Sequence, residues 1–265
     1  MPNNTAWLLR NAFYALGRSK LDRSKANVLG EYSASWESFA RHLDKCKTLD
    51  EWLYVRGLED KPAYYNVGGR LSYQAFDSND FNRRKLLAIL RKDFPNIQSV
   101  TEYGCGLGRN LLFLKQQMPH LEVFGYELCQ PGVDIAKRAA EKFGLDVQYS
   151  QLDYVSAPER DYVFPATDVA FTMYSLEQLP KSNRTAVQNI LAHTKCASIH
   201  IEPVPENYPL TLRGLVGRLD HYKADYLKDF DRNVRALNLA SVTKEAIDSA
   251  HNPLMFPSAY VLRKS

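Results

Sequence analysis

The sequence lacks the features that mark several large classes of protein. Its 265 residues include only four cysteines, with no C-x-x-C pair, so neither a disulfide framework nor a structural zinc site is expected. No window approaches the roughly 18 apolar residues of a membrane span, and the polar start Met1-Pro2-Asn3-Asn4-Thr5 does not resemble a signal peptide. The net charge is only +4, whereas nucleic-acid partners usually require a concentrated basic stripe. These absences predict a cytoplasmic globular protein.

The opening segment is nevertheless locally basic. Five cations, Arg10, Arg18, Lys20, Arg23 and Lys25, face only Asp22 within the first 25 residues. Apolar residues such as Trp7, Leu8 and Phe13 interleave with them, which is typical of an amphipathic helix. We expect this helix to pack on the main body with a solvated basic edge. Contact with a membrane surface or with RNA is the less favoured alternative.

Two kinds of pattern divide the chain. Residues 1–95 read as helices joined by polar loops, and they are expected to form a helical cap that covers a substrate region. Residues 96–265 alternate short apolar runs with helical stretches, which is typical of a parallel sheet with helices on both faces. The expected strands are 99–103, 121–127, 146–151, 168–174, 197–203, 241–244 and 259–262; the expected helices are 109–118, 133–143, 181–193 and 219–237. The predicted fold is a Rossmann-like α/β domain with a seven-stranded, mostly parallel sheet.

A glycine-rich loop is the most informative stretch. The expected strand ending at Tyr103 leads into Gly104, Gly106 and Gly108, and a helix opens directly afterwards. Glycines let the backbone turn tightly and approach a ligand closely, and a helix start offers unpaired N–H groups. Nineteen residues after Gly108, the next expected strand ends in Glu127, where a carboxylate can accept hydrogen bonds from both hydroxyls of a ribose. The ordered set predicts a nucleoside-binding site.

The spacing of the glycines separates two kinds of nucleoside site. Dinucleotide sites usually show G-x-G-x-x-G, whereas this loop is G-x-G-x-G preceded by Glu102. The pattern resembles the first motif of class I S-adenosylmethionine-dependent methyltransferases of the small-molecule type. A nicotinamide-dependent dehydrogenase is therefore a distant alternative.

The resemblance implies a cofactor and a set of cofactor-binding positions. The cofactor would be S-adenosylmethionine, released as S-adenosylhomocysteine. Glu127 matches the acid that holds the ribose hydroxyls, and Asp153, after Leu152, matches the acid near the adenine amino group. Met173 and Tyr174 lie at the end of the fourth strand, which faces both the methionine part of the cofactor and the substrate. The implied cofactor-binding set is Glu102, Gly104, Gly106, Gly108, Glu127, Leu152, Asp153 and Met173.

Candidates for catalysis and for substrate binding follow from their place at strand ends. Glu202 shares a strand face with His200 and lies nearer the carboxyl end of the strand, where ligands bind. Glu202 is therefore the first candidate for a basic or substrate-binding group, while His200 is interpreted as a core histidine. His221 and Tyr174 complete the catalytic candidates. The competing interpretation is an exposed helix position for His221 and core packing for Tyr174. Tyr65, Arg70 and Glu206 are the candidate substrate contacts, and no metal site is expected.

The predicted function is methyl transfer to oxygen or nitrogen of a polar small molecule, such as a sugar or a secondary-metabolite intermediate. The segment after the expected fourth strand, Thr172-Met173-Tyr174-Ser175, lacks the Asn/Asp-Pro-Pro-Tyr/Phe turn of enzymes that methylate adenine amines or release factors. Two alternatives remain open: a methyltransferase acting on RNA or protein, and a non-catalytic partner that retains the fold. Nucleic acid is the less favoured partner, and the oligomeric state is open.

Overall fold

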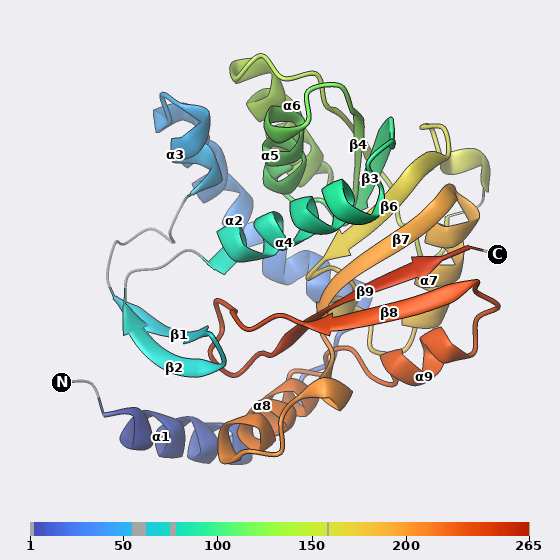
Figure 1. Ribbon diagram of the computed structural model, residues 1–265. Helices are drawn as coiled ribbons and strands as arrows, with labels where there is room; N and C mark the ends of the chain where they lie inside the picture. The colour runs from blue at the N-terminus through green and yellow to red at the C-terminus, as the bar shows by residue number, and fades with distance from the viewer. Residues whose placement is uncertain (1–2, 55–61, 75–77, 158, 265) are drawn as a thin grey trace.

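The centre of the molecule is a seven-stranded sheet, seen in the computed structural model, which describes residues 3–54, 62–74, 78–157 and 159–264 (Figure 1). The strands are β3 (Ser99–Tyr103), β4 (Glu122–Glu127), β5 (Gln148–Gln151), β6 (Thr167–Met173), β7 (Thr194–Pro203), β8 (Ser241–Ala246) and β9 (Pro257–Arg263). Their order is β5-β4-β3-β6-β7-β9-β8, and only β9 pairs antiparallel with its neighbours β7 and β8. The predicted Rossmann-like fold class is confirmed.

Strand order reverses between β3 and β6, the first and fourth strands of the sheet. From β3 the chain passes outward through β4 to β5, and then returns to the other side of β3 as β6. In open α/β sheets, ligands bind outside the carboxyl ends of the strands at such a reversal. The fold therefore points to the edge at which β3, β4, β5 and β6 end.

Helices cover both faces of the sheet. Successive side chains of the inner strands point to opposite faces and are buried in a hydrophobic core on each. On one face, Val169 and Phe171 pack with the helices α4 (Ser78–Asp93), α5 (Arg109–Gln117) and α6 (Gln130–Lys142). On the other face, Ala170 and Tyr260 pack with α7 (Asn183–Ala192) and α9 (Phe230–Arg235). Short 3₁₀ turns connect these elements: η1 (Glu159–Asp161), η2 (Leu176–Gln178) and η3 (Pro205–Asn207).

The segment before β3 is only partly helical, which corrects the prediction of helices alone. It contains α1 (Asn4–Gly17), α2 (Lys25–Lys45) and α3 (Leu49–Leu53), followed by a hairpin of β1 (Ala63–Val67) and β2 (Arg70–Gln74). The hairpin turns at Gly68 and Gly69, both in the left-handed region. Tyr64 and Tyr73 pair across it with ring centroids 5.0 Å apart, and such aromatic cross-strand pairs favour a sheet over a helix.

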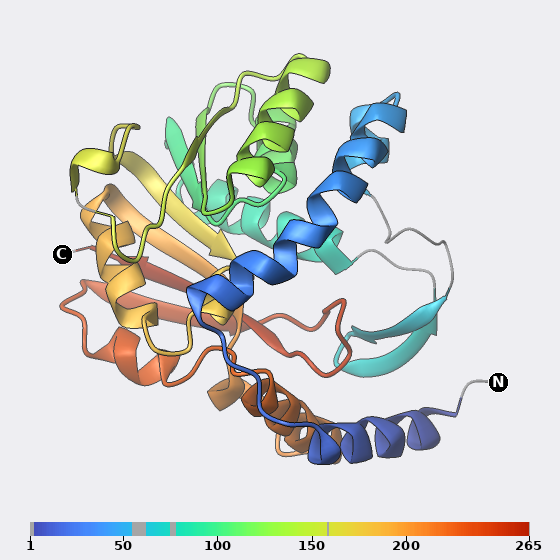
Figure 2. The same cartoon turned by 180° about the vertical axis from the view of Figure 1, so that it is seen from behind.

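The expected long helix over 219–237 is also divided. The structure has α8 (Leu212–Lys223), then a break in which Asp225 and Asp229 adopt positive φ, and then α9. Helix α8 lies beside α1 at the lower edge of the molecule in Figures 1 and 2. Within the described ranges, none of the helices combines the length and the apolar character needed to cross a membrane.

Candidate functional site

A cavity of about 430 Å³ opens at the edge of the sheet where strand order reverses. Four strand ends supply one side of it, with lining residues Gly104 and Gly106 after β3, Glu127 at the end of β4, Leu152 and Asp153 after β5, and Tyr174 and Ser175 after β6. The start of α2 supplies the opposite side and crosses this edge in Figure 2. The tertiary structure thus brings together residues separated by about 150 positions in the sequence.

The glycine loop is shaped by left-handed backbone at Gly104 and Gly106, with φ of +74° and +53°. A Cβ on Gly104 would lie 1.9 Å from the Ser175 hydroxyl oxygen, so the absence of a side chain lets β6 end against the loop. A Cβ on Gly106 would have no atom within 4 Å. Since Gly106 lines the cavity, that open space is part of the cradle into which a ligand can approach the backbone.

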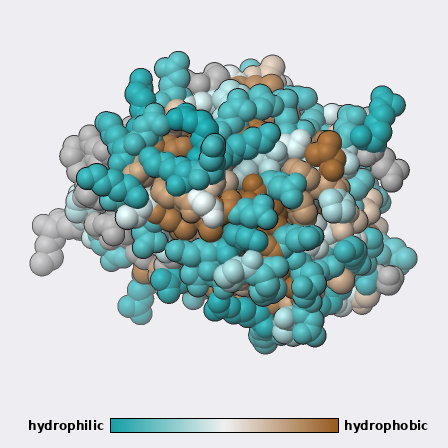
Figure 3. Space-filling view, turned by 90° about the horizontal axis from the view of Figure 1, so that it is seen from above, coloured by the Kyte–Doolittle hydropathy of each residue, from teal (hydrophilic) through white to brown (hydrophobic). Residues whose placement is uncertain are grey.

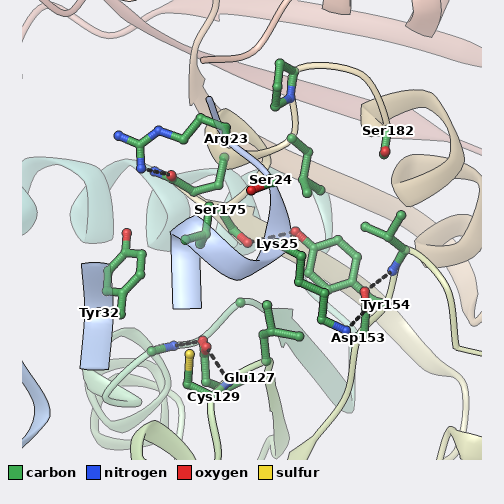
Figure 4. A pocket seen from close by; sticks show the side chains of 18 of the residues that line it. Arg23, Ser24, Lys25, Tyr32, Glu127, Cys129, Asp153, Tyr154, Ser175 and Ser182 are labelled. Atoms are coloured by element: carbon green, nitrogen blue, oxygen red, sulfur yellow. Dashed lines mark hydrogen bonds and ion pairs between the residues drawn. The ribbon is translucent and has the colours of Figure 1, made fainter. Parts of the chain in front are cut away.

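Glu127 is held in place by the loop that it faces. Its two carboxylate oxygens accept hydrogen bonds from the backbone N–H of Gly106 at 2.8 Å and from that of Cys129 at 3.0 Å. The side chain lines the cavity floor in Figure 4, next to the thiol of Cys129. A carboxylate has about four lone-pair sites, so acceptor capacity remains for a ligand with hydroxyl groups.

Asp153 is already engaged by α2. Its Oδ2 accepts from Lys25 Nζ at 2.7 Å and from the Ser156 hydroxyl at 2.6 Å, and its Oδ1 accepts from the N–H of Val155 at 3.2 Å. These donors hold the pKa of Asp153 below its usual value, although burial opposes them. The ion pair of Lys25 and Asp153 joins the two walls of the cavity (Figure 4).

Two hydroxyl groups and a strained tyrosine lie at the end of β6. The hydroxyls of Tyr154 and Ser175 are hydrogen-bonded at 2.8 Å, and both residues line the cavity (Figure 4). Tyr174 adopts φ of +56°, which is uncommon for a residue with a bulky side chain, and its hydroxyl accepts from Asn82 Nδ2 at 3.3 Å. Burial raises the pKa of Tyr174, so its phenol is neutral at physiological pH. Strained backbone of this kind clusters at ligand sites.

Three residues of the predicted cofactor set do not line the cavity. Glu102 is fully buried and its Oε1 accepts from Asn110 Nδ2 at 2.7 Å, while burial raises its pKa to about 8. Gly108 packs against Tyr149, and Met173 belongs to the core beside α4. Their placement gives them a supporting role for the loop and the strand end, and direct contact with a cofactor stays a prediction.

Glu202 and His221 are buried and do not line the cavity, and a catalytic role for either stays a prediction. Glu202 is fully buried and accepts from the N–H groups of Ser175, Leu176 and Glu177 at 3.0 to 3.1 Å, so it holds the turn after β6. Burial raises its pKa to about 7. His221 is also buried, which corrects the exposed position expected for it.

The surroundings of His221 explain why it is buried. Its Nε2 lies 2.8 Å from the carbonyl oxygen of Leu227, and its Nδ1 lies 3.4 Å from the hydroxyl of Tyr208. Burial lowers the pKa of His221 to about 4, so the imidazole is neutral at pH 7. His200, expected in the core, contacts the hydroxyls of Thr172 and Ser198 at 3.0 and 2.9 Å. Neither histidine lines the cavity.

The predicted substrate contacts are also placed away from the cavity lining. Tyr65 is buried in the hairpin and packs edge-on against His251, with ring centroids 5.3 Å apart. Arg70 is exposed at the hairpin turn, and Glu206 lies in η3. Among the described residues no group of three potential metal-ligating side chains is present. None of Tyr65, Arg70 and Glu206 lines the cavity, and their role in substrate binding stays a prediction.

Sequence reasoning missed the wall that α2 supplies. Four residues of α2 line the cavity from one side, namely Lys25, Val28, Tyr32 and Trp36, together with Arg23 and Ser24 just before the helix. The spacing of Val28, Tyr32 and Trp36 at i, i+4 and i+8 places them on one helix face, which was a readable signal. Arg23 is fixed there by hydrogen bonds to Gln178 Oε1 at 3.0 Å and to the Tyr226 hydroxyl at 3.2 Å.

Comparisons with known proteins agree with this geometry. Residues 100–196 match the model of a methyltransferase domain family, and this stretch contains the glycine loop, Glu127, Asp153 and the end of β6. The chain is also 32% identical to demethylmenaquinone methyltransferase from Thermus thermophilus over 89 residues. That alignment covers 34% of this chain and 40% of the relative, so the chain spans less than half the length of the relative that it matches.

Solved structures share the fold over a longer stretch. Magnesium protoporphyrin IX methyltransferase (ChlM) from Synechocystis PCC 6803, with bound S-adenosylhomocysteine, superposes with a TM-score of 0.59 and 14% identity over 91% of this chain and all of that one. The plantazolicin methyltransferase BpumL, also with S-adenosylhomocysteine, gives 0.53 and 9% over 71% of this chain and 85% of that one. The shared fold and the match of residues 100–196 to a methyltransferase domain together bear out the predicted resemblance to methyltransferases.

Proposed function

We propose that this chain, which carries a methyltransferase domain at residues 100–196, binds S-adenosylmethionine in the cavity at the sheet edge and transfers its methyl group to an acceptor. The observation that carries the proposal is the convergence of four strand ends on one cavity. Each end presents the residue type that the class I pattern assigns to it. A glycine cradle, an anchored carboxylate, a second acid and a strained aromatic residue face the same space.

The residues of the cavity fit the cofactor. Glu127 is oriented by the N–H groups of Gly106 and Cys129 and retains lone pairs for the two ribose hydroxyls. The open space above Gly106 admits the ligand close to the backbone. Leu152 and Asp153 form the wall for the adenine ring. Asp153 can accept a hydrogen bond from the adenine amino group once Lys25 no longer donates to its Oδ2.

We further propose that the acceptor is a polar small molecule methylated on oxygen or nitrogen. The cofactor supplies a methyl group already activated on a sulfonium, so the chain's own residues have to hold the acceptor in line at about 3–3.5 Å and accept a proton where it carries one. Tyr174 and Ser175 stand at the strand end where the acceptor would meet the methyl group. Arg23, Gln178 and Ser182 add polar groups to the lining.

The helical cap proposed for residues 1–95 acts in this scheme through α2. This helix supplies one wall of the cavity, and its Tyr32 and Trp36 stack with ring centroids 6.0 Å apart. The wall is tied to the sheet side by the ion pair of Lys25 with Asp153 and by the hydrogen bond of Arg23 to Gln178. Asp22, Arg23 and Ser24, just before α2, also line the cavity, whereas the described hairpin of β1 and β2 does not.

The test is a calorimetric titration with S-adenosylhomocysteine, with NAD in a parallel experiment. We expect saturable micromolar binding of the first ligand alone. Glu127→Ala should weaken that binding by about 1–3 kcal/mol, because a charged acceptor of two hydroxyl groups is lost. Glu122→Ala is the matched control, because Glu122 lies at the other, exposed end of the same strand. Binding of NAD, or equal affinities of the Glu127→Ala variant and the wild type, would refute the assignment.

A further inference from the structure

Helix α1 is apolar on the side that faces away from the protein as well as on the side that packs. Its packed side includes Ala15, which is fully buried. Leu9, Phe13 and Leu16 follow each other at i, i+4 and i+7, so they form one stripe on the other side of the helix. Their side chains are 48%, 72% and 62% exposed. Exposed stripes of this size are unusual on a helix that only packs against its own domain.

Helix α8 continues this exposed apolar surface. Leu212, Leu215 and Tyr222 recur at i, i+3 and i+10 and are 59%, 51% and 55% exposed, and Leu210, just before the helix, is 83% exposed. The two helices are packed side by side, and Arg18 of the segment after α1 donates to the carbonyl of Asp220 at 2.8 Å. We call Leu9, Phe13, Leu16, Leu210, Leu212 and Leu215 the α1–α8 apolar surface.

The concentration of exposed apolar side chains is specific to this end of the molecule. Of the fourteen large apolar side chains that are exposed in the described ranges, nine lie on α1, on α8 or within four residues of these helices. The opposite end, which is uppermost in Figure 1, is mostly hydrophilic, with smaller apolar groups between the polar side chains (Figure 3). General surface composition therefore does not explain the α1–α8 apolar surface.

The charges around this surface are predominantly positive. Residues 1–21 carry Arg10, Arg18 and Lys20 and no acid, and α8 adds Arg218, whereas Arg213 of the same helix is buried against the hairpin. Lys20 is paired with Asp225 at 3.1 Å. Asp220, the next acid along α8, is paired with Arg18 at 3.3 Å. A partner that covers the apolar stripe therefore meets a cationic rim, which complements an anionic surface.

We propose that the α1–α8 apolar surface docks this protein on an anionic lipid bilayer, with both helices lying in the interface plane. An apolar helical stripe that enters the acyl boundary, flanked by Lys and Arg that meet anionic headgroups, is how interfacial helices bind membranes. A second copy of the chain is disfavoured because the same cationic rim would face itself. The segment 18–24 leads directly from α1 to the α2 wall of the cavity, so docking brings that wall near the lipid surface.

The proposal is tested by co-sedimentation of the full chain with sucrose-loaded vesicles. We expect partitioning onto vesicles of phosphatidylcholine mixed with phosphatidylglycerol, little partitioning onto phosphatidylcholine alone, and release by salt. Phe13→Ser and Leu215→Ser should each lower the partition coefficient about tenfold, since each removes a large apolar side chain from the acyl boundary. Arg10→Ser should lower it about fivefold and only on the anionic vesicles.

Val163→Ser is the matched control because Val163 is 64% exposed but lies between η1 and β6, away from both helices. It should partition as the wild type does. Each variant is first shown to retain its circular dichroism spectrum and unfolding midpoint. Absence of binding to the anionic vesicles, or equal binding to both vesicle types, would overturn the proposal. A dimer detected by light scattering without lipid, and dissociated by Phe13→Ser, would assign the surface to a second copy instead. None of these outcomes depends on methyl transfer.

Discussion

Gly104 and Gly106 have the same backbone conformation but opposite surroundings, and this predicts different effects of adding one methyl group. Gly104→Ala places a Cβ 1.9 Å from Ser175 Oγ and 2.6 Å from Ser175 Cβ, whereas Gly106→Ala meets no atom within 4 Å. Both variants carry the cost of left-handed backbone, about 1–2 kcal/mol for a residue with a Cβ. Gly104→Ala adds a packing cost of about 1–3 kcal/mol. We expect it to lower the free energy of unfolding by about 2–5 kcal/mol, and Gly106→Ala by about 1–2 kcal/mol.

A second substitution at Ser175 separates strain from overlap. Ser175→Gly removes both offending atoms and leaves Ser175 Cα at 3.8 Å, an ordinary contact, so it should restore part of the stability of Gly104→Ala. Ser175→Ala is the control, since it keeps the Cβ at 2.6 Å and should restore little. Urea unfolding of the four single variants and two double variants gives the coupling free energies directly.

Ligand affinity supplies the other half of this prediction. The methyl group of Gly106→Ala points into open space at the cavity, so this variant should bind S-adenosylhomocysteine much more weakly while it loses only the stability due to backbone strain. Equal loss of stability in Gly104→Ala and Gly106→Ala would refute the reasoning. So would rescue by Ser175→Ala as large as rescue by Ser175→Gly.

Three further predictions concern individual side chains. Lys25→Ala should tighten S-adenosylhomocysteine binding up to about fivefold, because an exposed ion pair worth about 0–1 kcal/mol no longer competes for Asp153; weaker binding in calorimetry would show that Lys25 itself contacts the ligand. Burial raises the pKa of Glu102 from about 4.5 to about 8, so the folded state retains a proton that the unfolded chain has lost. Protonated Glu102 therefore contributes, on the order of a few kcal/mol, to the free energy of unfolding below pH 4.5, and this contribution is lost as the pH rises towards 8. Urea titrations should show that the free energy of unfolding of Glu102→Gln changes less with pH over that window. The same change with pH as in the wild type would contradict the burial argument. Tyr174→Phe, which removes the contact with Asn82 Nδ2, should leave cofactor affinity within about twofold and lower turnover of an identified acceptor, whereas unaltered kcat and KM would limit Tyr174 to packing.

The cofactor side of the site was readable from the sequence because its signals are local. The loop after β3 needs residues without a Cβ, and Gly104 and Gly106 stand there at fixed spacing. Glu127 and Asp153 each follow a short apolar run, and parallel strands bring their carboxyl ends to one edge. Strand boundaries agreed within two or three residues for the same reason, since buried parallel strands are continuous apolar runs.

The sequence did not indicate that Glu202 and His221 are buried away from the cavity lining, because burial is not a local property. Glu202 does lie at a strand end, but the turn after β6 folds over it and three N–H groups occupy its carboxylate. His221 occupies a polar stretch of sequence, yet Tyr208 and Leu227 enclose it. In both cases, residues distant in sequence or a change of chain direction decided what the side chain faces.

The sequence by itself determined the fold class, the positions of the central strands along the chain and the glycine-rich loop of the predicted nucleoside site. Periodicity and glycine spacing are readable because they act over a few residues. Only the tertiary structure decided that α2 forms the second wall of the cavity and that Lys25 pairs with Asp153, 128 residues away. It likewise decided that the exposed stripes of α1 and α8 lie at the same end of the molecule. Contacts between segments that are distant in the sequence depend on how whole helices and strands pack. The residue pattern of one segment does not tell where the other segment lies.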